Sequence, residues 1–298
     1  MYSSPGTAMR LKTNHIRTAL LLCFSLLSIA TGLTEAADKT AATLLARDAL
    51  TTPNQPATIE VRLLSNRITG AVGLGGEPVE LVQAGTVVAK SMTGGDGKAV
   101  LQFTPKGRDT IVLTVRTGES PRVAPAETTL TLASWERRRP ILAVEVASVM
   151  TEVPPASSPI AALSGQAALG DPLPDAADEL SKVSQYYYNI LYVLTNATDL
   201  SGGFEANDRI RRWLTDHKFP PGYVRLIPAG DEAIGKSLDD LHAAGWTTVK
   251  TGVGRSRAFA EAFLQRRLEA VMVPEPAKSE TPKKAKVAKE WKEVRKKL

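Results

Sequence analysis

The feature that most constrains the fold is a continuous apolar run at 141–146, which reads Ile-Leu-Ala-Val-Glu-Val. The segment Arg137-Arg138-Arg139-Pro140 precedes it and separates it from the first half of the chain. A strand with one wet face alternates apolar and polar residues, whereas a continuous apolar run is typical of a parallel strand covered on both faces. We therefore expect 141–146 to be a central strand of an α/β domain.

Apolar runs and amphipathic segments alternate after this strand. Because strands that alternate with helices form doubly wound parallel sheets, 140–275 is predicted to be a Rossmann-like domain. Ligands of such sheets bind at the carboxyl ends of the strands, here near Glu145, Thr195, Pro228 and 251–255. The predicted strands are 141–146, 190–194, 223–227, 247–250 and 269–273, and the predicted helices are 174–186, 205–217, 236–244 and 256–266.

Residues 38–135 consist of short β-rich runs separated by turn residues. The glycine-rich segment 93–97 is typical of a tight turn between strands. Strands at this spacing predict an all-β sandwich in front of the α/β domain. The predicted strands are 41–47, 57–65, 78–83, 86–92, 98–104, 109–116 and 127–132.

The first 36 residues resemble an export signal in their layout. Basic residues precede an apolar stretch at 18–33, and small residues then predict cleavage after Ala36. An uncleaved membrane anchor is the alternative. We expect an exported protein, periplasmic or secreted. Cys23, the only cysteine, lies in this segment, so a cleaved chain has no thiolate chemistry.

The segment 276–298 is strongly basic, with nine Lys or Arg against three Glu in its last 22 residues. Val287, Trp291, Val294 and Leu298 form one apolar stripe if the segment is a helix. Such a helix either docks on the α/β domain or lies on an anionic membrane surface. A basic tail on a nearly neutral body does not predict a nucleic-acid-binding protein, and the sequence leaves the oligomeric state open.

Two segments resemble known families. The stretch from Gly76-Glu77-Pro78-Val79 to Thr93–Ala99 resembles bacterial immunoglobulin-like domains. The segments 171–177, 189–195 and 212–222 resemble phosphatases of the haloacid dehalogenase (HAD) type, most closely the lipin or phosphatidate-phosphatase branch, and the likeness spans 141–275.

The HAD resemblance implies four functional elements, of which the first supplies both nucleophile and acid, and several are altered here. Glu145 stands where the family has its nucleophilic Asp, and Ala147 replaces the general acid. Thr195 keeps the hydroxyl that contacts phosphate, and Lys236 is the candidate for the charge-balancing lysine. Phe259 replaces a metal-binding Asp. The loss of nucleophile, acid and metal ligand predicts a domain without phosphatase chemistry.

A glycine-rich loop that leads into the predicted helix 256–266 retains features of an anion site, since free N–H groups at a helix start favour anions. We therefore expect a degenerate, non-catalytic domain that binds a partner or a phosphorylated ligand such as a lipid headgroup, without metal or cofactor. The alternatives are a divergent Mg²⁺-dependent phosphatase that uses Glu145 on a phospholipid or another phosphomonoester, and a purely structural envelope protein. The candidate ligand-binding residues are Thr195, Asn196, Gly252, Gly254, Arg255 and Ser256.

Overall fold

The computed structural model describes residue 1 and residues 39–67, 70–152, 169–195, 203–230 and 232–298. Thr40–Leu298 forms one compact unit, and Met1–Lys39 is a separate unit. The predicted leader and its cleavage site at Ala36 lie, apart from Met1, outside the described residues. Within the described part of the chain, no helix has both the length and the apolar content needed to cross a membrane.

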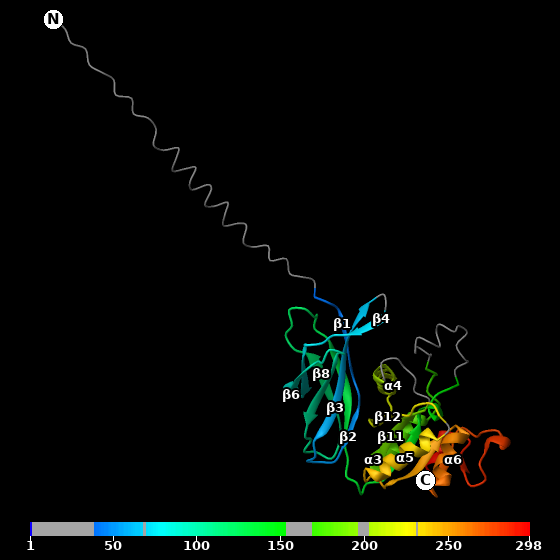
Figure 1. Ribbon diagram of the computed structural model, residues 1–298. Coiled ribbons are helices and arrows are strands. Elements are labelled where there is room, and N and C mark those ends of the chain that lie inside the picture. The colour runs from blue at the N-terminus through cyan, green and yellow to red at the C-terminus, as the bar shows by residue number, and fades with distance from the viewer. Residues whose placement is uncertain (2–38, 68–69, 153–168, 196–202, 231) are drawn as a thin grey trace. The chain divides into compact units, whose positions relative to one another are not determined.

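The first half of the compact unit consists of two sheets (Figure 1). Both sheets contribute to one apolar core, in which Ile59, Val61 and Leu63 of β3 are buried while Thr58 before them and Glu60 between the first two are exposed. This period of two is the pattern of a strand with one wet face. One sheet has the order β1 (Ala42–Ala46), β3 (Ala57–Arg67), β4 (Gly70–Gly73), with β7 (Lys98–Phe103) also on β3; the other has the order β2 (Ala49–Thr51), β9 (Glu127–Ser134), β8 (Thr110–Thr117), β5 (Pro78–Gln83), β6 (Thr86–Met92).

The second half is built on a six-stranded sheet in which every pairing is parallel. The first of its strands in sequence, β10 (Ile141–Glu145), lies between two partners, and all five of its residues are buried. The continuous apolar run thus forms a central strand that is covered on both faces, as predicted. The strand order is β12 (Tyr223–Leu226), β11 (Asn189–Leu194), β10, β13 (Val249–Gly254), β14 (Glu269–Met272), β15 (Lys286–Val287).

Helices cover both faces of this sheet. Leu142 and Val144 of β10 belong to a cluster with residues of α3 (Ala176–Tyr186) and α4 (Phe204–Asp216). Ile141 and Ala143 point the other way, into a cluster with residues of α5 (Ala233–Ala243) and α6 (Arg257–Gln265). Alternate residues of one strand thus enter two cores, so both faces require apolar side chains.

Strand β13 differs from the sequence prediction, which ended it at 250. The observed strand continues through the glycine-containing segment to Gly254. A methyl group on Gly252 would lie 2.8 Å from the Phe263 ring, so this glycine lets an aromatic side chain of α6 approach the strand. Glycine is disfavoured in strands by intrinsic propensity, but this close packing overrides the preference.

The prediction of a single helix in the basic tail is wrong. The segment instead forms a 3₁₀ turn η2 (Lys278–Glu280), the strand β15 and a short helix α7 (Trp291–Val294). Pro282 cannot continue a helix, and pairing with β14 draws 286–287 into the sheet. Trp291 and Val294 are buried in the cluster that also holds Leu142, and the Trp291 indole N–H donates to Ser148 O at 2.9 Å. The docked arrangement is therefore the one observed.

Candidate functional site

The candidate site is centred on the Glu145 carboxylate, at the carboxyl end of the central strand β10. Glu145 is 1% exposed, and its oxygens accept three hydrogen bonds. Oε2 accepts from the backbone N–H groups of Arg255 and Ser256 at 2.7 and 2.8 Å, and Oε1 accepts from Ser256 Oγ at 2.6 Å. The carboxylate therefore sits on the loop that joins β13 to α6.

Ser256 connects this carboxylate to helix α6. Its hydroxyl also accepts the N–H of Phe259 at 3.2 Å, which makes Ser256 the N-cap of the helix. Free N–H groups and the helix dipole favour a negative charge at such a position. The loop before α6 thus binds an anion, as its sequence suggests. That anion is the Glu145 carboxylate of the same protein.

Gly254 makes room for this arrangement. A methyl group on Gly254 would lie 2.9 Å from Glu145 Oε2 and closer still to the Phe259 ring. Only a residue without a side chain allows β13, the carboxylate and α6 to approach so closely. The role of this glycine is therefore explained by contacts within the protein.

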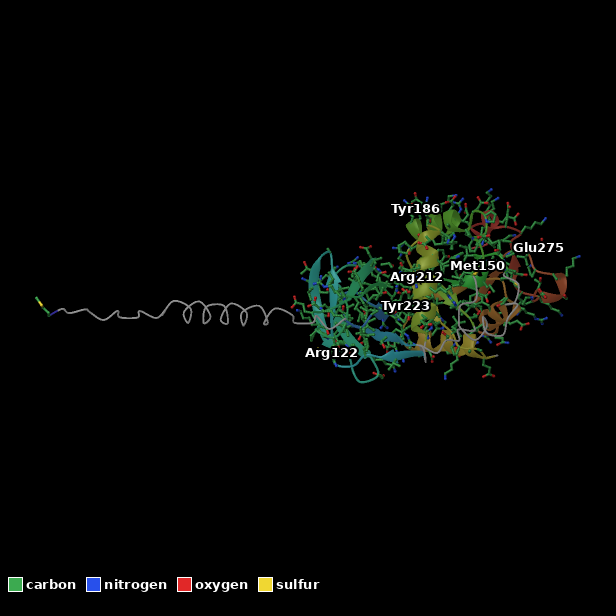
Figure 2. The ribbon with its side chains drawn as sticks, turned by 90° about the horizontal axis from the view of Figure 1, so that it is seen from above. Arg122, Met150, Tyr186, Arg212, Tyr223 and Glu275 are labelled. Atoms are coloured by element: carbon green, nitrogen blue, oxygen red, sulfur yellow. The ribbon has the colours of Figure 1, made fainter. Side chains whose placement is uncertain are left out.

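The Arg255 side chain is directed away from the carboxylate that its own N–H binds. Its Nη2 donates to the carbonyl of Met150 at 2.8 Å, and its Nη1 lies 3.5 Å from the exposed carboxylate of Glu152 (Met150 is labelled in Figure 2). The guanidinium therefore holds the segment after β10, and its positive charge is not centred on the Glu145 carboxylate.

The remaining candidates are only partly brought together. Thr195 directly follows β11 at the same edge of the sheet as Glu145, since Val193 is the strand partner of Glu145. Lys236 is exposed on α5, which begins at Ala233 rather than at 236. Among the described residues, neither side chain forms a hydrogen bond or ion pair with Glu145. Asn196 lies outside the described residues.

Ala147 and Phe259, which the HAD resemblance aligns with an acid and a metal ligand, have neither chemistry. Ala147 lies in the 3₁₀ turn η1 (Val146–Ser148) directly after β10 and has no proton to transfer. Phe259 is 1% exposed and packs against Phe263, with ring centroids 4.9 Å apart. Phe259 thus belongs to the apolar core beneath α6.

The residues around Glu145 do not fit the Mg²⁺ ion that a HAD-type phosphatase implies. Mg²⁺ requires oxygen ligands, but the partners of Glu145 are two N–H groups and a hydroxyl that donates. In the part of the chain that the structure describes, no group of three or more His, Cys, Asp or Glu side chains could hold a metal ion.

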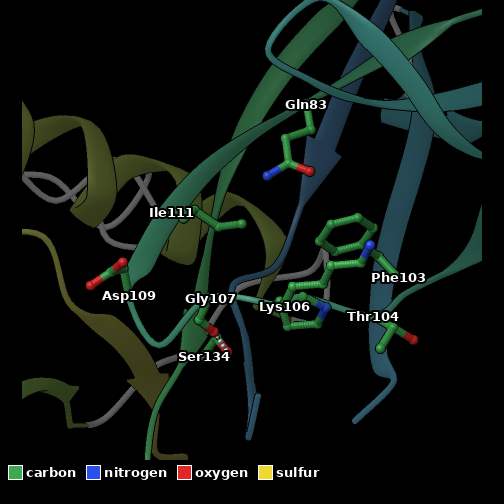
Figure 3. Close-up of a pocket in the computed structure, with 9 residues that line it drawn as sticks. Gln83, Phe103, Thr104, Lys106, Gly107, Asp109, Ile111 and Ser134 are labelled. Carbon is green, nitrogen blue, oxygen red and sulfur yellow. Dashed lines mark hydrogen bonds between the residues drawn. The ribbon is translucent and has the colours of Figure 1, made fainter. Parts of the chain in front are cut away.

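A cavity of about 370 Å³ lies in the two-sheet half, away from these residues (Figure 3). Phe103 and Ile111 contribute its apolar wall, and Lys106 and Asp109 are exposed at its edge. Ser134 Oγ donates to Gly107 O at 2.6 Å and ties two lining segments together. None of the residues predicted as functional lines this cavity.

No protein-family model and no curated protein matches the chain. Similarity to solved structures is weak and partial. A D,D-heptose bisphosphate phosphatase from B. bronchiseptica, a HAD-family enzyme solved with magnesium and phosphate, is 15% identical, with a TM-score of 0.39, over 53% of this chain and 97% of the other.

Other similarities to solved structures are weaker. The titin M10–obscurin-like 1 Ig complex is 13% identical over 31% of this chain and 89% of that one, with a TM-score of 0.23. The D0–D1 domain of intimin is 12% identical over 31% of this chain and 46% of that one, with a TM-score of 0.21. Similarities at this level support no functional argument.

Proposed function

We propose that this chain is an exported, non-catalytic binding protein in which a phosphatase-like sheet serves as a scaffold. The observation that supports the proposal is the buried Glu145 carboxylate, which is 1% exposed and accepts three hydrogen bonds from the loop before α6. We propose further that the α/β half is a degenerate HAD domain of the lipin branch. The two-sheet half that precedes it would be an immunoglobulin-like sandwich.

Glu145 is poorly placed to act as a nucleophile. An attacking carboxylate must approach phosphorus to about 3–3.5 Å, and a nearly inaccessible oxygen cannot do so without local rearrangement. Three donors also stabilise the negative charge on its oxygens and reduce their reactivity. Because Ala147 cannot protonate a leaving group, even a rearranged Glu145 would lack its acid partner.

The same geometry argues against a phosphate ligand at this loop. A phosphoryl group would need the N–H groups of Arg255 and Ser256, which Glu145 already uses. Of the two kinds of ligand expected from the sequence, we therefore propose a macromolecular partner bound elsewhere on the surface. Phosphate binding by the unmodified protein would contradict this choice.

The catalytic part of the proposal is tested by phosphatase assays with Mg²⁺ on residues 37–298 and on Glu145→Gln. The substrates are p-nitrophenyl phosphate and a phosphatidate dispersed in detergent. We expect no turnover above the buffer rate for either protein. Turnover in the unmodified protein that is lost in Glu145→Gln would establish the divergent phosphatase instead.

Export is tested separately, by expressing the full chain in a bacterium and measuring the intact mass of the product from the periplasm and the medium. We expect a protein that begins at residue 37, because the small residues before it suit signal peptidase. A product that keeps residues 1–36 in the cytoplasm would contradict export, and one that keeps them in the membrane fraction would indicate the anchor.

A further inference from the structure

The two halves of Thr40–Leu298 meet at a buried acidic residue, Asp48, for which the sequence carries no local motif. Asp48 lies between β1 and β2 of the two-sheet half, and its side chain is fully inaccessible. Its Oδ1 accepts the N–H of Thr131 in β9 at 2.9 Å, and its Oδ2 accepts the N–H of Val224 in β12 at 3.2 Å. One carboxylate therefore binds a strand of each half.

Helix α4 completes the shell around Asp48. Arg211 Nη1 lies 3.3 Å from Asp48 Oδ1, and the backbone N–H of Asp48 donates to Asn207 Oδ1 at 3.2 Å. Arg211 is shared with a second carboxylate, because its Nη2 lies 2.6 Å from Asp208 Oδ1. Asp208 also pairs with the exposed Arg212. Arg211, the cation nearest to Asp48, thus interacts with two carboxylates, those of Asp48 and Asp208.

Other charged or titratable groups approach Asp48 from each side. In β12, Tyr223 and Arg225 flank Val224, and burial raises the pKa of the Tyr223 hydroxyl (Arg212 and Tyr223 mark α4 and β12 in Figure 2). From the two-sheet half, Arg47 stacks on the Phe204 ring of α4 at 4.6 Å and pairs with Glu60 at 3.0 Å.

Apolar contacts hold the same elements together. Phe204 packs with Leu45 and Leu64 of the two-sheet half. Trp135, which follows β9, is buried in the same cluster as Ile227, which follows β12. The junction is thus a packed interface in which Asp48 is a deeply buried charge.

We propose that Asp48 makes this junction a pH-sensitive joint, which holds α4 and β12 on the two-sheet half more firmly in mildly acidic solution than at neutral pH. Ionised Asp48 is a buried charge whose desolvation the shared Arg211 and two N–H groups only partly offset. Neutralising it removes that cost, whereas local opening of the junction returns the group to water.

The direction of the pH dependence follows from the balance between the desolvation of Asp48 and its interactions with Arg211 and the two N–H groups. Desolvation by burial, opposed by Arg211 and the two N–H donors, raises the pKa of Asp48 from 3.8 to about 6. A carboxyl whose pKa is higher in the closed junction stabilises it fully below pH 3.8, and this stabilisation is lost as the pH rises through about 6.

The size of the effect is bounded by the same pKa values. A difference of this size corresponds to at most about a 100-fold change in the closing equilibrium. Because pH 5.0 lies about one unit below the raised pKa and pH 7.5 lies above it, we expect about a 10-fold change between these two pH values.

The test is amide hydrogen exchange of the full chain by NMR at pH 5.0 and 7.5, with each rate divided by the intrinsic rate at that pH. In the unmodified protein, the protection of the Val224 amide should be about 10-fold higher at pH 5.0. Asp48→Asn, which cannot titrate, should show no such change. Glu60→Gln, which removes a nearby but half-exposed carboxylate, should behave as the unmodified protein.

Protection of Val224 that is unchanged or lower at pH 5.0, or an equal pH dependence in Asp48→Asn, would overturn the proposal. If Asp48→Asn does not fold, Arg211→Gln replaces it. Removal of the neighbouring cation raises the pKa of Asp48 further, so the midpoint of the Val224 transition should move to higher pH. An unmoved midpoint would equally overturn the proposal. A phosphatase activity, should one be found, leaves this test unaffected.

Discussion

Ser256 Oγ donates to Glu145 Oε1 at 2.6 Å, across 111 positions of the chain. This bond and two backbone N–H bonds join the central strand to the start of α6. A position that the HAD resemblance assigns to chemistry therefore holds a carboxylate that stabilises the fold, and this role can be tested by substitution.

Replacement of Glu145 should destabilise the protein. Glu145→Ala leaves two backbone N–H groups and the Ser256 hydroxyl without their acceptor, at a cost of about 2–4 kcal/mol. Glu145→Gln keeps one acceptor oxygen, so it should lose about 1–2 kcal/mol. The measurement is urea-induced unfolding of residues 37–298 followed by tryptophan fluorescence. A fully stable Glu145→Ala protein would show that the carboxylate is dispensable.

A small carboxylate should rescue the alanine variant. The space left by the side chain and the free N–H groups of Arg255 and Ser256 suit acetate, because helix starts favour anions. We expect acetate to raise the melting temperature of Glu145→Ala and to leave the unmodified protein unchanged, with sodium chloride of equal ionic strength as the control. Equal shifts in both proteins would indicate a general salt effect and contradict a specific site.

Gly254→Ala should be destabilising because of the close approach of Glu145 and the Phe259 ring. The added methyl group requires strand and helix to move apart, at a cost of about 1–3 kcal/mol. The matched control is Gly95→Ala, since nothing lies within 4 Å of a methyl group at Gly95. Similar unfolding midpoints for the two variants would refute the packing role of Gly254.

Trp291→Ala should be among the most damaging substitutions in the tail. It removes a large side chain from the core and leaves the carbonyl of Ser148 without its indole donor, which should cost about 3–5 kcal/mol. Lys296→Ala, at an exposed position in the same tail, should leave the unfolding midpoint unchanged. The docked position of the tail would be wrong if both variants unfolded at the same urea concentration.

Contact of the tail with an anionic membrane should depend on charge alone. Since Trp291 and Val294 lie in the core, the tail can meet a lipid surface through its exposed basic side chains and not through these two apolar residues. Co-sedimentation of residues 37–298 with phosphatidylglycerol vesicles should be weak at low ionic strength and vanish at about 0.15 M salt, where screening acts within about 8 Å. Sedimentation that persists in high salt would indicate an apolar insertion that this structure does not provide.

Sequence patterns predicted those elements whose stability is local or periodic. The apolar run at 141–146 identified β10, and the alternation around Ile59 identified β3. The end of β13 was not predictable in this way, because packing of the Phe263 ring overrode the low strand propensity of Gly252. The course of the tail was not predictable either, because it depends on the pairing of β15 with β14 and on the burial of Trp291.

The candidate site could be predicted only in part, for a similar reason. The loop before α6 indicates an anion, but the identity of that anion depends on a strand 110 positions earlier. Asp48 has no local signal at all, because Arg211 and Val224 are 163 and 176 positions away. Contacts of this kind become visible only when the sheets have been assembled.

The position of β10 in its sheet has a consequence for biosynthesis. Its partners on the two sides are β11 and β13, and β13 begins at Val249, more than 100 positions after Ile141. At about 5–20 residues per second, a ribosome needs roughly 5–20 s to make this interval, during which the apolar strand has no second partner. Sheets with such distant pairings also fold slowly. The nascent chain therefore exposes an apolar, aggregation-prone segment for seconds. We expect a chaperone that holds unfolded chains to bind at 141–146.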